Sequence, residues 1–143
     1  MELSAKVEYA LIALLELASQ PSQNGPMQIK QIAERQKIPD RYLEQVFAIL
    51  RQAGIVYSQR GNKGGYMLAR EPWQITLLEI FSCLEELKGS KRLQANAPSD
   101  SLLVQDVWKE AQQTAREVLQ RYTLRDLCQQ REARQRLGGM YYI

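Results

Sequence analysis

Two thiols are the only strongly nucleophilic side chains in the chain, and no histidine accompanies them. Cys83 and Cys128 stand far apart and in no CxxC spacing, so they form neither a zinc motif nor a disulfide framework. The lack of histidine removes the commonest general base and the commonest metal ligand. We therefore expect no enzyme and no metal site. Both cysteines are interpreted as small apolar side chains, and a thiol switch is the alternative if one lies exposed near a cation.

The second chemical feature is a glycine-rich basic loop at residues 59–65, between two short β-prone runs at 55–58 and 66–69. It carries Arg60, Lys63 and three glycines. Such a loop lets the backbone approach phosphates closely and lets a cation enter a narrow minor groove. It lacks the GxxxxGKS or GxxxxGKT pattern of a nucleotide-binding loop, so we reject nucleotide binding. An ordinary hairpin with solvent-facing cations is the alternative.

The third feature is an amphipathic segment at residues 39–53, which predicts a helix. Arg41 and Gln45 stand near its beginning, where an arginine suits guanine and a glutamine suits adenine. Tyr42 could contact a phosphate or a thymine methyl group, and Glu44 could accept from cytosine or exclude other bases. The alternative is that all four are solvated residues on an amphipathic helix. The inner face holds the apolar side chains Leu43, Val46, Phe47 and Leu50.

The distribution of charge supports a polyanion as partner. The 143 residues hold 19 Lys and Arg against 16 Asp and Glu. Eight of those cations and only three of the acids fall in residues 28–70, whereas residues 1–27 are acidic and residues 71–143 are balanced. A chance cluster on a solvated surface is one interpretation, and a surface that faces nucleic acid is the other.

The order of expected elements indicates how these residues are positioned. Helices are predicted at 4–19, 28–36 and 39–53, followed by the hairpin, and this is the order of a winged helix-turn-helix. Further helices are expected at 76–87, 102–122 and 124–137, with a polar linker at 88–101 and a frayed tail from Gly138. We predict a mostly α chain with a DNA-binding domain at 1–73 and a helical linker and dimerisation region at 74–143.

Apolar residues recur at heptad spacing along the long helix expected at 102–122. A single winged domain has little surface left to bury such a stripe, so a twofold partner is favoured over packing back on its own domain. The predicted dimerisation residues are Val104, Trp108, Ala111, Ala115, Val118 and Tyr122.

Four segments resemble the Rrf2 family of bacterial winged-helix transcription regulators. They are YLEQVFAILRQAGIV at 42–56, RGNKGGYMLAR at 60–70, YALIALLELA at 9–18 and TLRDL at 123–127. The resemblance implies a homodimer that binds a near-palindromic operator as a repressor or activator, and we expect a repressor. It implies DNA contacts at Arg41, Tyr42, Glu44, Gln45, Ser58, Arg60 and Gly61. The predicted DNA-binding set further contains Gln28, at the start of the second helix, and Lys63.

Many members of that family hold an iron–sulfur cluster through three cysteines in the segment that corresponds to 88–101, where this chain has none. Glu8 matches a position where some members offer a carboxylate ligand, but one carboxylate is not a site. Two distant cysteines cannot supply the several converging thiolates that a cluster needs, so no cofactor is predicted.

The remaining expectations concern location and the competing function classes. The longest apolar run, at 9–15, is too short to span a bilayer, and no signal peptide opens the chain. We expect a cytoplasmic protein with double-stranded DNA and a second copy of itself as partners, and with no membrane partner. A winged-helix module that binds proteins and has lost DNA binding is the alternative function. The sequence names neither the operator nor an effector.

Overall fold

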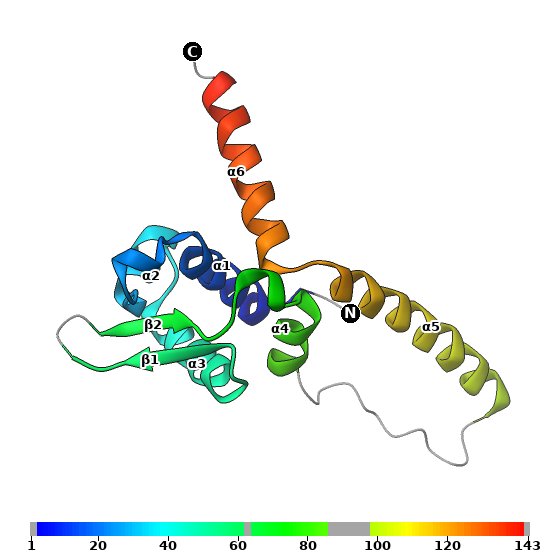
Figure 1. The fold of residues 1–143 in the computed structure, drawn as a ribbon. Helices are drawn as coiled ribbons and strands as arrows, with labels where there is room; N and C mark the ends of the chain where they lie inside the picture. Colours follow the sequence, from blue (N-terminus) through cyan, green and yellow to red (C-terminus); the bar gives the residue numbers. More distant parts are fainter. Residues whose placement is uncertain (1–2, 62–63, 86–97, 142–143) are drawn as a thin grey trace.

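The computed structural model describes residues 3–61, 64–85 and 98–141. Within these ranges the chain is mostly helical, with one small two-stranded sheet (Figure 1). The elements are α1 (Ala5–Ser19), a 3₁₀ turn η1 (Ser22–Asn24), α2 (Ile29–Gln36), α3 (Asp40–Gln52), β1 (Val56–Gln59), β2 (Gly65–Leu68), a second 3₁₀ turn η2 (Pro72–Gln74), α4 (Leu77–Leu84), α5 (Ser99–Arg121) and α6 (Leu124–Tyr141). The predicted winged helix-turn-helix order is confirmed.

Helix α1 runs through the middle of the body and contacts α2, α3, α4, α6 and β2. It begins where the sequence predicts, because the Ser4 side chain accepts a hydrogen bond of 3.2 Å from the Val7 amide and caps the first turn. Its apolar side chains lie on the faces that those neighbours cover, so α1 is the helix around which the core forms. The buried apolar members are Val7, Ala10, Ala13, Leu14 and Leu17.

The turn between α2 and α3 depends on one left-handed residue. Lys37 has φ 56° and ψ 45° and reverses the chain after α2. Ile38 is buried and anchors the turn, and Pro39 is extended and caps α3. Pro39 was expected as the first helical residue, and the helix instead begins at Asp40. The short turn packs α2 against α3, as a helix-turn-helix requires.

The hairpin pairs β1 and β2 in antiparallel register, with Val56 opposite Leu68 and Gln59 opposite Gly65. The chain before α2 adds a third, one-residue strand to its other edge. There the Met27 amide donates to the Tyr66 carbonyl at 3.0 Å, and the Tyr66 amide donates to the Met27 carbonyl at 2.7 Å. This bridge, which the sequence did not indicate, ties the hairpin to the start of α2.

The junction between α5 and α6 is joined to the junction between η2 and α4. The Leu77 amide donates to the Tyr122 carbonyl at 2.9 Å, and the Leu124 amide donates to the Ile75 carbonyl at 3.0 Å. Thr76 and Thr123 form a β-bridge between these bonds. Both threonines also cap the following helix, as their positions in the sequence predict.

One hydrophobic core joins the winged helix to the helices that follow it. Ile75, Ile80, Leu84 and Leu124 are buried together with the side chains of α1 and α3. The boundary predicted after residue 73 therefore passes through this shared core. No helix among the described residues combines the length and apolar character that crossing a bilayer requires.

The C-terminal helices differ most from expectation. Helix α6 continues to Tyr141, so the prediction of a frayed tail from Gly138 is wrong. Residues 134–137 are good helix formers, and each further residue adds a backbone hydrogen bond at little cost once the helix has begun. Helix α5 starts at Ser99, three residues before the predicted start. Helix α4 ends at Leu84, and Glu85 already has a non-helical backbone, so the predicted helix end at Leu87 is wrong. Most of the predicted linker lies outside the described residues.

Candidate nucleic-acid interface

The outer face of α3 presents polar side chains to solvent. Arg41, Gln45 and Ala48 follow one another at helical spacing and are exposed, and Glu44 is exposed beside them. The opposite face is fully occupied by the predicted apolar set, because Leu43, Val46, Phe47 and Leu50 are all buried. The inner face therefore fixes the helix on the body and leaves the outer face free for a ligand.

Tyr42 lies on the flank of α3 and is not a free surface residue. Its ring makes an edge-to-face contact with the ring of Tyr9 on α1, with centroids 5.7 Å apart. Half of the Tyr42 side chain remains exposed. The contact orients the phenol beside the first turn of α3. No local pattern predicts this contact, since the two residues are on different helices.

The hairpin tip keeps the shape that its glycines allow. Gly61 has φ 116° and is exposed, and its carbonyl accepts from the Gly64 amide at 2.9 Å. A Cβ at Gly64 would lie 2.5 Å from the Gln59 carbonyl oxygen, so only glycine fits this turn. Ser58 and Arg60 are exposed at the same end of the hairpin, and Lys63 lies outside the described residues.

An aromatic stack fixes the hairpin against α3. The ring of Tyr66 on β2 stacks on the buried ring of Phe47, with centroids 4.6 Å apart and planes 29° apart. The hairpin is therefore packed directly against α3. Figure 1 shows α2, α3 and the hairpin on one side of the body, while α5 and α6 leave it in other directions.

The cations on this side are available to a polyanion. Lys30, Lys37, Arg41, Arg51 and Arg60 are exposed, and none of them joins an ion pair within the part of the chain that the structure describes. Gln28, at the start of α2, is exposed as well, and its backbone amide donates to the Gln31 side chain at 3.0 Å. Unpaired exposed cations beside a helix-turn-helix are what phosphate binding needs.

The predicted dimerisation residues lie on or directly after α5, a helix that contacts α4 but buries none of its own side chains. No side chain of α5 is buried, and Val104 is 68% exposed and Trp108 is 54% exposed. Ala111, Val118 and Tyr122 are also exposed, and Ala115 is partly covered. Leu103 and Val107, which the heptad pattern does not include, widen the same apolar face and are mostly exposed.

The two cysteines do not fit a cluster held by thiolates. The Cys83 thiol on α4 donates to the Ile80 carbonyl at 3.2 Å, and the Cys128 thiol on α6 accepts from the Ser19 hydroxyl at 4.0 Å. Burial raises the pKa of the Cys128 thiol, against the opposing effects of the Ser19 hydrogen bond and the Arg131 charge. Among the described residues no three or more acids and cysteines gather as metal ligands do.

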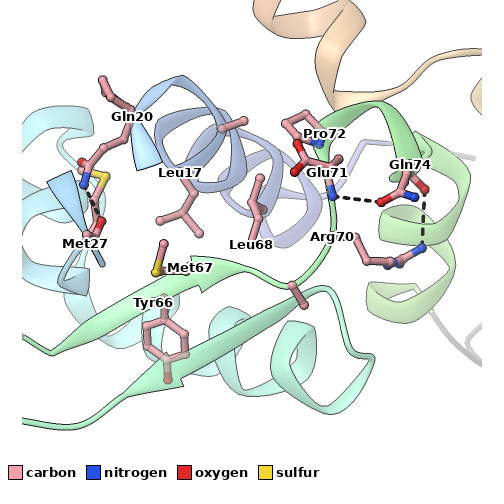
Figure 2. A pocket seen from close by; sticks show the side chains of 14 residues that line it. Leu17, Gln20, Met27, Tyr66, Met67, Leu68, Arg70, Glu71, Pro72 and Gln74 are labelled. Carbon is pink, nitrogen blue, oxygen red and sulfur yellow. Dashed lines mark hydrogen bonds between the residues drawn. The ribbon is translucent and has the colours of Figure 1, made fainter. Parts of the chain in front are cut away.

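A pocket of about 480 Å³ lies behind the hairpin, between α1 and β2. Figure 2 shows Leu17 of α1 and Met67 and Leu68 of β2 around the same space, with Arg70 and Gln74 at one end. Arg70 is held by Glu79, with one bond of 2.5 Å, and by the Gln74 carbonyl at 3.4 Å. The lining brings no acid, base and nucleophile together, so the pocket does not point to catalysis.

Fold and surface together define the class, which is a winged helix-turn-helix protein with a basic glycine wing. The profile of the Rrf2 family, described as iron-dependent transcriptional regulators, matches residues 3–130. The chain therefore belongs to the Rrf2 family. It is a DNA-binding transcription regulator and not an enzyme.

Individual relatives agree with this assignment. The Synechocystis regulator slr0846 is 43% identical over 89% of this chain and 87% of its own length. The regulator IscR of Cronobacter sakazakii is 35% identical over 92% of this chain and 83% of its own. Among solved structures, that of CymR, the global cysteine regulator of B. subtilis, has a TM-score of 0.75 and 33% identity, and covers 90% of this chain and 97% of that one. The structure of T. potens IscR has a TM-score of 0.77 and 37% identity, with 94% and 91% covered.

Proposed function

We propose that this protein is a homodimeric, sequence-specific repressor that binds a near-palindromic operator. The observation that carries the proposal is the exposed polar face of α3 beside a wing whose Arg60 has no ion-pair partner among the described residues. A helix can enter the major groove while a basic wing reaches the adjacent phosphates and minor groove. Such a regulator acts in the cytoplasm, where bacterial DNA lies.

Specific roles follow from position. Arg41 and Gln45 on the first turns of α3 read base edges, Glu44 excludes wrong bases, and Tyr42 contacts a phosphate or a thymine methyl group. In the wing, Arg60 and Lys63 neutralise phosphates, and Gly61 lets the backbone come close. Gln28 and Ser58 add hydrogen bonds to the sugar–phosphate backbone. Residues 1–73 thus carry the DNA contacts, and residues 74–143 carry the dimer.

The uncovered apolar face of α5 supports the dimer. A helix of 23 residues with no buried side chain needs a partner for its valines and its tryptophan. A second copy would cover both α5 helices with the same surface, and its twofold symmetry matches a near-palindromic site. The predicted stripe from Val104 to Tyr122 would form the centre of that interface.

We further propose that this member of the family acts without an iron–sulfur cluster. The family is described as iron-dependent, but the two thiols of this chain lie on different helices and the segment 88–101 holds no cysteine. Absorbance of protein purified without oxygen tests the proposal. Cluster bands that disappear in Cys83→Ser would contradict it.

Selection of bound duplexes from a random pool would define the operator, and substitution at the wing then tests the site. We expect Arg60→Ala to weaken operator binding by about fivefold to tenfold and to lower the slope of log affinity against log salt by about one. Arg134→Ala, an exposed cation on α6, is the matched control and should change neither quantity. Equal losses in both variants would contradict a wing-mediated site.

The alternative function is a winged-helix module that binds another protein and has lost DNA binding. The composition of the wing distinguishes DNA binding from this alternative. Its cations stand beside glycines that allow close backbone approach, which serves phosphate binding and has no evident use in a protein interface. A wild-type chain that selects no duplex at low salt would favour the alternative.

A further inference from the structure

Glu16 is the one charged side chain that is buried among the described residues, and the proposed DNA contacts do not use it. An isolated buried carboxylate would be costly, and this one is compensated by three donors. The Gln36 amide and the Arg131 guanidinium, at 3.1 Å, donate to one oxygen, and the Arg35 guanidinium lies 3.5 Å from the other. The donors come from α2 and α6, so a single carboxylate of α1 joins the helix-turn-helix to the C-terminal helix.

Arg131 fixes the orientation of α6 relative to α1 through two hydrogen bonds. One of its terminal nitrogens donates to Glu16 at 3.1 Å, and the other donates to the Ser19 hydroxyl at 3.3 Å. Two bonds from one planar guanidinium fix its orientation as well as its distance. The arginine is only 30% exposed, so solvent screens this pair less than a surface pair. Helix α6 is thereby held along the C-terminal half of α1.

A second anchor holds the beginning of α6. Leu124 is buried in the core, and its amide bonds the Ile75 carbonyl. Leu124 and Arg131 are seven residues apart along α6, which corresponds to two turns, or about 10 Å. Two anchors at that separation define the direction of the helix relative to the body. Helix α5 ends at this second anchor, where the Tyr122 carbonyl accepts from the Leu77 amide, so its direction is constrained there too.

We propose that Arg131, acting through Glu16 and Ser19, is a positioning residue that sets the angle between α6 and the winged helix. Because α5 leaves the body at the junction from which α6 starts, that angle also sets the half-site spacing that the dimer accepts. The inference rests on the proposed homodimeric function. One added base pair turns a half-site by about 35° and moves it by about 3.4 Å. A dimer with a fixed angle must discriminate against that change, whereas a dimer with a loose angle tolerates it.

The test uses Arg131→Met, which keeps the aliphatic stem and removes both bonds. Glu16 retains Gln36 and Arg35, so the variant should still fold. Affinities are measured for a duplex with one half-site and for the selected operator with its spacer changed by one or two base pairs. We expect unchanged affinity for the single half-site and a roughly fivefold fall in the preference for the native spacer over its one-base-pair neighbours. Arg131→Lys keeps one compact charge, so its preference for the native spacer should lie between that of the wild type and that of Arg131→Met.

Arg134→Met, on the same helix and exposed, is the control and should keep the spacer preference. An Arg131→Met protein with the wild-type spacer preference overturns the inference. An equal loss of affinity on the half-site and on every spacer overturns it as well, because such a loss is what a merely structural role produces.

A measurement without DNA separates this inference from the proposed function. Spin labels on p-acetylphenylalanine introduced at the exposed positions Gln59 and Gln135 report the distance between wing and α6 within one chain, when labelled chains are diluted with unlabelled ones. Arg131→Met should widen that distance distribution, and Arg134→Met should not. An unchanged width overturns the inference whether or not the protein binds DNA, whereas a wild-type chain that selects no operator refutes only the proposed function.

Discussion

At the scale of single residues, close backbone approach decides where glycine is required. Gly65 begins β2 with φ 152°, and a Cβ there would lie 2.3 Å from the Met27 carbonyl oxygen. That oxygen belongs to the bridge that ties the hairpin to α2, so it cannot move without breaking a hydrogen bond. Gly138 on α6 shows the contrary case, because an added Cβ would meet nothing within 4 Å.

These two glycines give a matched prediction for stability. Gly65→Ala should lower the free energy of unfolding by about 2 kcal/mol or more, through strain and loss of the Met27–Tyr66 bridge. Gly138→Ala should raise it by about 0.5–1 kcal/mol, because alanine loses less backbone entropy in a helix. Urea unfolding followed by circular dichroism measures both. Equal effects of the two substitutions would show that the hairpin does not depend on the close contact.

Cys128 shows how burial governs thiol chemistry. Because burial raises the pKa of this thiol, the folded state favours its neutral form. The contribution of Cys128 to the free energy of unfolding is complete below the pKa of this thiol in the unfolded chain. It is lost as the pH rises through the pKa of the thiol in the folded chain. The thiolate, which is the reactive species, is therefore less populated in the folded chain than in the unfolded chain.

We accordingly expect slow modification of Cys128. In Cys83→Ser protein near neutral pH, an aromatic disulfide reagent should react more slowly with the folded chain than with the chain in urea. The difference in rate should narrow as pH rises above the folded pKa. Faster reaction in the folded state would instead support the thiol switch left open by the sequence.

At the scale of elements, α5 is the helix whose apolar side chains are exposed to solvent in the single chain. It is about 35 Å long and has an apolar face from Leu103 to Tyr122 that stays exposed. The heptad pattern predicted that face, and the structure adds Leu103 and Val107 at its edge. A soluble monomer seldom leaves a contiguous apolar face of this length in water.

Neighbouring substitutions on α5 test the dimer. Trp108→Ala should weaken self-association by about 2 kcal/mol or more, which is roughly a thirtyfold rise in the dimer dissociation constant. Lys109→Ala, one residue further and on the opposite side of the helix, should leave the constant nearly unchanged. Sedimentation velocity over a range of concentrations measures both. A wild-type chain that sediments as a monomer would contradict both the proposed α5 interface and the proposed twofold operator.

At the scale of the whole molecule, residues 1–73, to which we assign the DNA contacts, do not form a complete hydrophobic core by themselves. Ile75, Ile80, Leu84 and Leu124 come from the part assigned to dimerisation, and each is at most 6% exposed. Burying one such side chain contributes about 1.5–3 kcal/mol. Their sum is comparable to the whole stability of a typical domain, so the two functional parts should unfold together.

A truncated chain tests this dependence. A fragment that ends at residue 73 should lose cooperative thermal unfolding, because the surfaces that cover α1 and α3 are missing. A chain that ends at residue 138 should keep it, since all four core side chains remain. Circular dichroism during heating measures both. A fragment 1–73 that melts cooperatively would show that the winged helix is an independent folding unit.

The sequence by itself determined the helices, the hairpin and the caps at Ser4, Thr76 and Thr123, because hydrophobic period, capping residues and glycine positions are local signals. It also determined the family, through motifs on the third helix and the wing. Its errors concern helix ends. A Gly-Gly pair suggested fraying of α6 that neighbouring helix formers overcome. The end of α4 and the start of α5 each differ from the prediction by three residues.

Only the tertiary structure decided how those elements are locked together. The Met27–Tyr66 bridge, the stack of Tyr66 on Phe47 and the bond from Arg131 to Glu16 each join residues that lie far apart in the chain. No local pattern records such pairs, because each partner by itself looks like an ordinary strand, core or surface residue. Their contact exists only once the burial of the core has brought the helices and the hairpin to fixed positions.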